Sequence, residues 1–329
     1  MPDEGIFTPD QIRSLAASFQ QSRVLLTAVE LDLFTQLGRQ LLTSSEVANK
    51  LGTDEHATDR LMNALVALGF LRKVHGKFYN TETAANYLVR GSTEFMGNLF
   101  HTNNMWNSWS TLTEAVRKGT SVHEFENLSS GNWLETFIDA MHYRAEREAK
   151  IISLMIDFTG VKKMLDVGGG SGAFSFEFVN KNPGMISVVF DLPEVIKLTK
   201  RYAEKYSLEE KIDYIEGDYL EDGFGTGCDL ILLSQIVHIN NYEQNKFLIK
   251  KCADALNNGG QIIIKDFVMN EDRTSPAAGA LFALNMLVAT ECGDTFTEKE
   301  MKEWFENAGI KKITRKNTSY GSDLIIGEK

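Results

Sequence analysis

A run of glycines that follows a short apolar strand is the stretch of this sequence best suited to chemistry. Residues 164–174 read MLDVGGGSGAF, so apolar residues and Asp166 precede Gly168, Gly170 and Gly172. Glycine lets the backbone turn tightly and has no Cβ to block a ligand. The helix that follows points its free N–H groups into the same turn. This pattern predicts a nucleotide-type site at the carboxyl end of a first strand.

The spacing of these glycines fits two cofactors. Gly168-x-Gly170-x-x-Ala173 fits the dinucleotide fingerprint, and Gly168-x-Gly170-x-Gly172 fits the loop of enzymes that use S-adenosylmethionine (SAM). The glycines therefore leave two classes open, an NAD-dependent oxidoreductase and a SAM-dependent transferase.

Polar residues also follow the next apolar strands. Asp191 ends the second strand, about 20 residues after the glycines, where a carboxylate accepts hydrogen bonds from ribose hydroxyls. Asp218 ends the third strand and can lie near an adenine. Ser234 and His238 follow the fourth strand, residues 229–233. The carboxyl ends of such strands meet at one edge of a doubly wound sheet, where ligands bind.

Taken in order, these motifs resemble the SAM-dependent small-molecule O-methyltransferases of the plant-type and hydroxyindole O-methyltransferase family. The resemblance covers nearly the whole chain and rests on LDVGGGSG at 165–172, DLPEV at 191–195, Gly217-Asp218, His238 and NGGQI at 258–262. It implies a Rossmann-like class I methyltransferase domain, an N-terminal helical winged-helix dimerisation domain, and SAM as cofactor.

The resemblance also implies roles for residues. The acid that matches the ribose ligand is Asp191, the acid by the adenine is Asp218, and the histidine that matches the general base is His238. A histidine suits this task because its unperturbed pKa lies near neutrality. The expected cofactor-binding residues are Asp166, Gly168, Gly170, Gly172, Asp191, Leu192, Asp218, Tyr219 and Ser234.

Two departures from the family pattern surround the expected base. Ile239 follows His238, where many members have Asp. A Gly-Gly-x-Glu-Arg-Thr stretch, whose Glu orients the base, aligns with residues 292–297, so that Thr295 replaces the Glu and Phe296 the Arg.

Glu291 and Asp294 are the expected substitutes for the missing acid, and we include them with His238 as catalytic candidates. A histidine with a weaker orienting group is less basic, which favours an acidic hydroxyl such as a phenol. A carbon acceptor and a non-catalytic SAM-binding or DNA-binding regulator remain alternatives.

Residues 84–158 are mostly helical in pattern and rich in aromatic and methionine side chains, which can line an apolar pocket. The segment FIDAM at 137–141 resembles a family segment beside the substrate, and a later apolar helix, 276–290, could cover the acceptor. The candidate acceptor-binding residues are Trp106, Phe137, Met141, His142 and Asn285, with His142 as a second polar contact.

The N-terminal part predicts an amphipathic helix over 23–37, with Val24, Ala28, Leu31 and Phe34 as buried positions. A winged helix-turn-helix is expected over 41–79, with helices at 45–50 and 57–68 and a hairpin at 71–74 and 77–79. Such a domain can bind DNA. Its second helix, however, carries Glu55, Asp59, Arg60 and Asn63, and acids there repel phosphates. We therefore expect a homodimer and no nucleic acid.

From residue 151 onward, strands and helices alternate, and two closing strands, 312–315 and 323–327, are expected to form a terminal hairpin. We expect three parts: 1–95 for dimerisation, 96–150 for helices lining the substrate pocket, and 151–329 for SAM binding. The 329 residues, 43% hydrophobic with a formal net charge of −11, are enough for more than one core.

Cys228, Cys252 and Cys292 lack metal-ligand spacing, so reduced thiols in a cytoplasm are expected, and no metal. No signal peptide and no membrane span are visible in the sequence.

Overall fold

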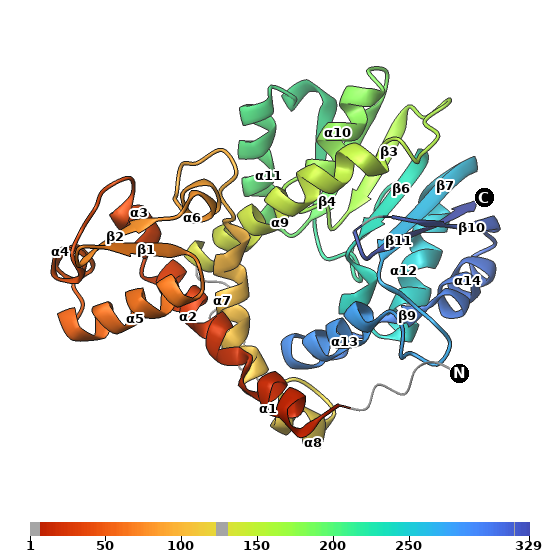
Figure 1. Ribbon diagram of the computed structural model, residues 1–329. Helices are drawn as coiled ribbons and strands as arrows, with labels where there is room; N and C mark the ends of the chain where they lie inside the picture. The colour runs from red at the N-terminus through yellow and green to blue at the C-terminus, as the bar shows by residue number, and fades with distance from the viewer. Residues whose placement is uncertain (1–6, 123–130, 319) are drawn as a thin grey trace. The chain divides into compact units, whose positions relative to one another are not determined.

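The computed structural model describes residues 7–122, 131–318 and 320–329 (Figure 1). The chain forms two compact units, residues 1–105 and 106–329. The division falls within helix α7 (Asn98–Trp109), so the expected middle segment, 96–150, belongs to both units.

The N-terminal unit is helical with one hairpin. Its elements are α1 (Pro9–Ala17), α2 (Phe19–Glu30), α3 (Leu33–Leu37), α4 (Ser44–Leu51), α5 (Glu55–Ala67), β1 (Leu71–Val74), β2 (Lys77–Asn80) and α6 (Glu82–Tyr87). Thr43 and Glu46 cap α4 reciprocally, with Glu46 N–H donating to Thr43 Oγ1 at 3.2 Å and Thr43 N–H to Glu46 Oε2 at 2.7 Å. The two helices and the hairpin predicted over 41–79 are confirmed.

The single helix predicted over 23–37 is wrong, because α2 ends at Glu30 and α3 begins at Leu33. Asp32 between them has φ = +57°, a left-handed conformation that Asp tolerates better than most residues. The turn lets Phe34 join Ala28 in the core, whereas Val24 and Leu31 are only half-buried.

The second unit is built on a seven-stranded sheet flanked by helices. Its strands are β3 (Lys163–Val167), β4 (Ile186–Asp191), β5 (Ile212–Glu216), β6 (Cys228–Ser234), β7 (Leu256–Asp266), β10 (Lys311–Asn317) and β11 (Asp323–Glu328). The order is β10-β11-β7-β6-β3-β4-β5, and only the pairings of β11 are antiparallel. The doubly wound, mostly parallel sheet and its terminal hairpin are confirmed.

Helices cover both faces of this sheet (Figure 1). α9 (Gly131–Ile152), α10 (Ala173–Lys181) and α11 (Pro193–Tyr206) cover one face, and α12 (Tyr242–Ala255) and α14 (Glu298–Asn307) cover the other. Two further helices, α8 (Leu112–Lys118) and α13 (Ala277–Ala289), pack against each other, and short 3-10 turns form at η1 (Glu209–Lys211) and η2 (Val237–Ile239). The two-residue strands β8 (Val268–Met269) and β9 (Phe296–Thr297) pair beside α14.

Strand β7 divides its side chains between two cores, because successive residues of a strand point to opposite faces. Ile262 and Ile264 pack in the core with α12 and α14, and Ile263 packs in the core with α9 and α10. Lys265 points to the same face as Ile263. Its Nζ lies 2.5 Å from Glu148 Oε2 on α9. These two side chains are at most 4% exposed, so the ion pair ties α9 to the sheet in a buried environment.

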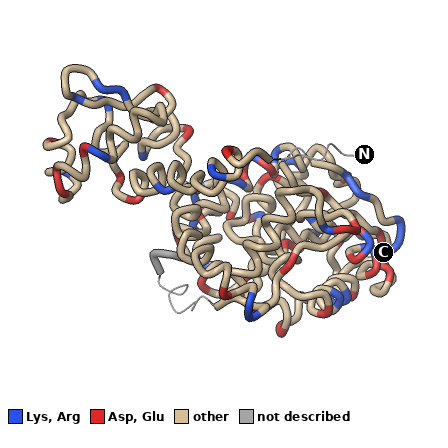
Figure 2. Tube along the Cα trace, turned by 60° about the horizontal axis from the view of Figure 1, so that its bottom comes forward, with Lys and Arg blue, Asp and Glu red and all other residues tan. Residues whose placement is uncertain are grey.

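Figure 2 shows Lys and Arg interspersed with Asp and Glu along the chain trace.

The buried pair leads to a stability prediction. Glu148→Gln should lower the free energy of unfolding by about 2–4 kcal/mol, because it leaves the Lys265 ammonium without a buried counter-charge. The matched change Glu146→Gln, in a more exposed pair with Lys150, should cost less than about 0.5 kcal/mol. Urea denaturation of both variants would test this, and equal costs would contradict it.

Candidate active site

The glycine turn leaves β3 and enters α10 in a conformation that needs glycine. Gly168, Gly170 and Gly172 have φ values of +65°, +57° and +83°. A Cβ on Gly168 would lie 2.2 Å from Ile236 Cδ1. Above Gly170, by contrast, a Cβ would meet only Ile138 Cδ1, at 3.9 Å. The turn is therefore packed on one side and open beside Gly170, where a ligand can approach the backbone.

Asp191 ends β4 beside this turn. Its carboxylate accepts the N–H of Gly170 and the N–H of Leu192, each at 2.8 Å. Burial raises the pKa of Asp191, and these two hydrogen bonds oppose the rise. A carboxylate has about four lone-pair sites, so acceptor capacity remains for the hydroxyls of a ribose.

The other expected cofactor residues lie at the ends of neighbouring strands. Asp218 is exposed after β5 and accepts the N–H of Leu220 at 2.8 Å. Burial raises the pKa of Tyr219 to about 12, and its hydroxyl donates to Asn240 Oδ1 at 3.0 Å. Ser234 is half-buried at the end of β6, between β3 and β7 in the sheet. The exposed Leu192 leaves an apolar side chain next to Asp191.

Asp166 supports the glycine turn from inside the protein. It is 1% exposed, and its Oδ2 accepts a hydrogen bond from Ser175 Oγ at 2.7 Å. A Cβ on Gly169 would lie 2.8 Å from the Asp166 Cγ. Burial raises the pKa of Asp166 to about 7.

His238 lies in η2, after β6, with its ring held by an acid from β7. Its Nδ1 is 2.9 Å from Asp266 Oδ1 and 3.0 Å from Oδ2. Asp266 Oδ1 also accepts the N–H of Phe267 at 2.8 Å, and the ring of Phe282 lies edge-on to His238 at 4.8 Å. A carboxylate at Nδ1 favours the tautomer with the proton on Nδ1. Nε2 is then left with a lone pair that can accept a proton.

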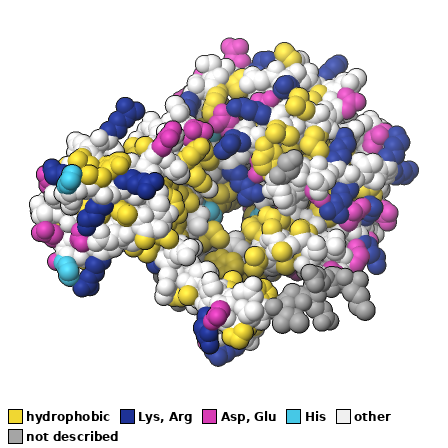
Figure 3. Space-filling view, viewed as in Figure 1, with side chains coloured by type: hydrophobic (Ala, Val, Ile, Leu, Met, Phe, Trp, Pro, Cys, Tyr) yellow, Lys and Arg dark blue, Asp and Glu magenta, His cyan; other side chains and the backbone are white. Residues whose placement is uncertain are grey.

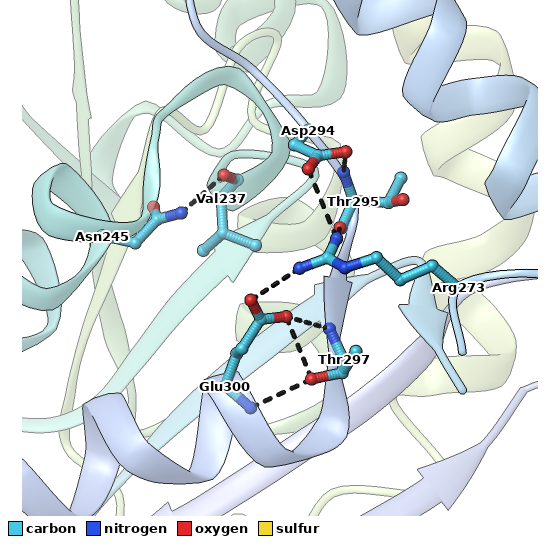
Figure 4. A network of polar contacts seen from close by, with 7 residues as sticks. All are labelled: Val237, Asn245, Arg273, Asp294, Thr295, Thr297 and Glu300. Carbon is cyan, nitrogen blue, oxygen red and sulfur yellow. Dashed lines mark hydrogen bonds and ion pairs between the residues drawn. The ribbon is translucent and has the colours of Figure 1, made fainter. Parts of the chain in front are cut away.

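The backbone of η2 is held by a second set of contacts (Figure 4). Asn245 Nδ2 donates to the Val237 carbonyl at 2.8 Å, and the Asp294 N–H donates to the His238 carbonyl at 3.0 Å. Arg273 Nη1 lies 3.3 Å from Asp294 Oδ2 and donates to the Thr295 carbonyl at 2.6 Å. Its Nη2 lies 2.6 Å from Glu300 Oε1, on the capped first turn of α14.

The expectation that Glu291 or Asp294 orients His238 is thus corrected, because Asp266 occupies Nδ1. Asp294 directs its carboxylate to Arg273 and touches His238 only through the backbone. Glu291 is exposed, and its carbonyl accepts a hydrogen bond from Thr120. Asp266 ends a strand that runs parallel to β6. The strand-end rule that identified Asp191 and Asp218 also fits Asp266.

The expected acceptor-binding residues are spread over three helices of the chain. Phe137 and Met141 are half-buried on α9, and Trp106 on α7 is 38% exposed. Asn285 on α13 accepts a hydrogen bond from the indole N–H of Trp109 at 2.8 Å, so Trp109 is a neighbour that the sequence analysis missed. Phe282, also missed, stacks on Phe267 with ring centroids 4.4 Å apart.

Apart from Asn285, α13 consists of apolar residues and glycine, and Figure 3 shows hydrophobic side chains on the surface around it. Leu281 is 60% exposed on this helix.

His142 does not offer a free polar contact. Its Nδ1 lies 2.8 Å from Ser171 Oγ and its Nε2 lies 3.0 Å from the Tyr206 hydroxyl. Both ring nitrogens are therefore used within the protein, which corrects the expectation that His142 is a second polar contact for an acceptor.

Gln235 carries a buried donor at the end of β6. Gln235, between Ser234 and η2, has φ = +61°, and its N–H donates to the Lys265 carbonyl at 2.8 Å. Its Nε2 is buried without a hydrogen-bond partner among the residues that the structure describes. An orphaned buried donor is costly unless a ligand satisfies it. Together with the open space beside Gly170, it fits a polar nucleoside cofactor at this edge of the sheet.

Comparison with known proteins agrees with this geometry. Residues 109–311 match the O-methyltransferase domain, and residues 14–91 match the O-methyltransferase dimerisation domain. The chain is 30% identical to 3-hydroxy-5-methyl-1-naphthoate 3-O-methyltransferase of Streptomyces sahachiroi, over 97% of this chain and 94% of the relative. It is 29% identical to acetylserotonin O-methyltransferase of Gallus gallus, over 99% of each.

Among solved structures, human N-acetylserotonin methyltransferase in complex with SAM superposes with a TM-score of 0.86 and 28% identity, covering 100% of this chain and 99% of that one.

The chain belongs to the O-methyltransferase family. Membership confirms the class I methyltransferase fold with an N-terminal dimerisation domain, and it confirms the predicted enzyme class and the predicted cofactor, SAM. It also decides between the two classes that the glycine spacing left open. The family's cofactor is SAM rather than NAD.

Two further observations concern only the described ranges, 7–122, 131–318 and 320–329. Within them, no three His, Cys, Asp or Glu side chains gather as metal ligands would. None of the helices there combines the length and the apolar composition of a membrane span.

Asp166 leads to a prediction with a definite sign. Its folded-state pKa is about 7, whereas an unperturbed Asp has a pKa of about 3.9. As pH rises between these values, the unfolded chain loses the proton first, so this group lowers stability progressively. Asp166→Asn cannot ionise, and its stability relative to wild type should rise by about 1–3 kcal/mol between about pH 5 and about pH 7.

Urea denaturation at both pH values would measure this difference, with Asp213→Asn as an exposed control. An unchanged difference between Asp166→Asn and wild type would contradict the raised pKa.

Proposed function

We propose that this enzyme methylates a phenolic hydroxyl of a small aromatic metabolite, with His238 as the general base and Asp266 as the acid that orients it. The observation that carries the proposal is the buried His238–Asp266 pair at the carboxyl end of the sheet. The substrate of the Streptomyces sahachiroi relative supports the proposal, because a hydroxynaphthoate carries its hydroxyl on an aromatic ring.

The chemistry divides between cofactor and protein. Bound SAM supplies a methyl group already activated by its positive sulfur. The glycine turn and Asp191 hold the cofactor at the edge of the sheet, and His238 Nε2 accepts the proton of the acceptor hydroxyl. Asp266 then stabilises the imidazolium that forms, because its carboxylate faces Nδ1. Phe267 and Phe282 keep an apolar surface against the pair and limit the access of water.

A phenol is the acceptor that this arrangement serves best. His238 has one carboxylate partner, Asp266, while the position aligned with the family's orienting Glu is the neutral, buried Thr295. Phenols have pKa values of about 10, well below those of aliphatic alcohols. One oriented imidazole therefore suffices as the base.

Substitution of the pair is the direct test. His238→Gln should lower turnover by about 10²–10⁴-fold, the usual contribution of a positioned base. Asp266→Asn should lower it by about 10–100-fold, because the tautomer is no longer held. Both should leave the affinity for S-adenosylhomocysteine nearly unchanged. His56→Gln and Glu291→Gln, at exposed positions, should remain within about twofold of wild type.

Turnover on a panel of phenols and matched aliphatic alcohols, together with calorimetry, would measure these effects. Wild-type turnover by His238→Gln on the least acidic acceptor would exclude the general-base role.

We also propose that the enzyme is a homodimer formed through the N-terminal unit. Residues 14–91 match a dimerisation domain. α1 has no buried residue, and Ile12 and Leu15 on α1 and Phe19 at the start of α2 are each more than half exposed. A second copy would cover this stripe.

The dimer can be tested without truncation. Leu15→Glu combined with Phe19→Glu should convert a dimer of the full chain into a monomer, because it places charge in an apolar contact. Gln20→Glu combined with Gln21→Glu adds the same charge at exposed positions and should leave the dimer intact. Light scattering at micromolar concentration would decide, and a monomeric wild type would overturn the proposal.

A further inference from the structure

His142 is a buried histidine whose two ring nitrogens and ring face all contact other side chains. It lies on α9 and is 6% exposed. Its ring stacks on that of Tyr202, which lies on α11, with the ring centroids 4.1 Å apart. The Tyr202 hydroxyl donates to Asp139, which lies on α9 like His142. Burial lowers the pKa of His142 to about 4, so the ring is neutral near neutral pH. A neutral imidazole has one donor and one acceptor, which matches its two partners, Ser171 and Tyr206.

Through Ser171, His142 contacts the glycine turn. Residues 168–172 read GGGSG, so Ser171 is the only residue of the cofactor turn with a side chain that can be held. The hydroxyl of Ser171 is directed into the protein, since the residue is 5% exposed and lies 2.8 Å from His142 Nδ1. Glycines lose more conformational entropy on ordering than other residues. A side-chain anchor in this turn therefore stabilises its cofactor-binding shape.

The other anchors of the turn come from different elements. Asp191 accepts the N–H of Gly170 at 2.8 Å, and Thr199 on α11 donates its hydroxyl to the Gly170 carbonyl at 2.6 Å. Asp191 and Thr199 thus hold Gly170, and His142 holds the next residue, Ser171. Three elements converge on two adjacent residues, Gly170 and Ser171.

α9 brings this anchor next to other parts of the site. Ile138, one turn before His142, places its Cδ1 over Gly170. Phe137 and Met141, candidates for the acceptor wall, lie on the same two turns. Glu148, further along α9, forms the buried pair with Lys265 that ties the helix to β7.

We propose that His142 is a positioning residue for SAM: through Ser171 it holds the glycine turn in the shape that binds the cofactor. The proposal depends on the cofactor and not on the role of His238. The Tyr206 hydroxyl contacts Nε2 on the opposite side of the ring, and α9 carries the anchor. Removing the His142–Ser171 hydrogen bond therefore weakens cofactor binding and leaves the chemical step intact once SAM is saturating.

The experiment uses two isosteric substitutions. The amide of Asn can replace Nδ1 of histidine, whereas the amide of Gln can replace Nε2. His142→Asn keeps a partner for Ser171, and His142→Gln keeps one for Tyr206. Ser171→Ala and Tyr206→Phe remove the two hydroxyls separately. The readouts are calorimetric affinity for S-adenosylhomocysteine, the thermal midpoint without ligand, and kcat at saturating SAM.

His142→Gln and Ser171→Ala should each weaken S-adenosylhomocysteine by about 3–10-fold, the range of one net hydrogen bond. Their combination should be no weaker than either alone, because they remove the same contact. His142→Asn and Tyr206→Phe should bind within about twofold of wild type. kcat at saturating SAM should stay within about twofold in every variant.

Three outcomes would overturn the proposal. The first is a lowered thermal midpoint in His142→Gln and Ser171→Ala with unchanged S-adenosylhomocysteine affinity, since a purely structural residue gives that result. The second is additive loss in the double variant, which would separate His142 from Ser171. The third is a loss of affinity in Tyr206→Phe as large as in Ser171→Ala. Calorimetry needs no turnover, so these results are independent of whether His238 is the base.

Discussion

The two hydrogen-bond contacts between the Asp266 carboxylate and His238 Nδ1 are the interaction on which the rest of the site depends. Both side chains are buried, and a buried carboxylate is costly unless it is paired. His238 follows β6 and Asp266 ends β7, so the pair forms only when these strands are parallel neighbours with Ser234 opposite Lys265. The sheet order and its register are therefore requirements of the proposed chemistry.

The last two residues of β7 make contacts on opposite faces of the sheet. Asp266 contacts His238 on one face, and Lys265 contacts Glu148 of α9 on the other. Because side chains alternate along a strand, two consecutive residues of β7 hold His238 and α9. A change of one residue in the register of β7 would exchange these side chains and break both contacts.

The loop that replaces the family's Glu-Arg-Thr stretch contacts His238 through its backbone. Gly293 and Asp294 lie against the His238 carbonyl, where a Cβ on Gly293 would come within 2.4 Å of that oxygen. Arg273 holds the loop in place by contacts with Asp294, the Thr295 carbonyl and Glu300 (Figure 4). The carboxylate of Asp294 is thereby neutralised by a guanidinium and removed from the imidazole.

Local patterns in the sequence determined the elements, because turns, caps and strand ends depend on near neighbours. The glycine turn, the strand ending in Asp191, the capping boxes at Thr43 and Thr297 and the terminal hairpin all follow from such patterns. Tertiary structure alone decided the partners of the two histidines. Asp266 lies 28 residues from His238, and Ser171 lies 29 residues from His142. Which strand end meets which histidine is set by strand order and helix packing, which residue spacing does not encode. Glu291 and Asp294 were expected in place of Asp266 because they lie close to Thr295, the position aligned with the family's orienting Glu.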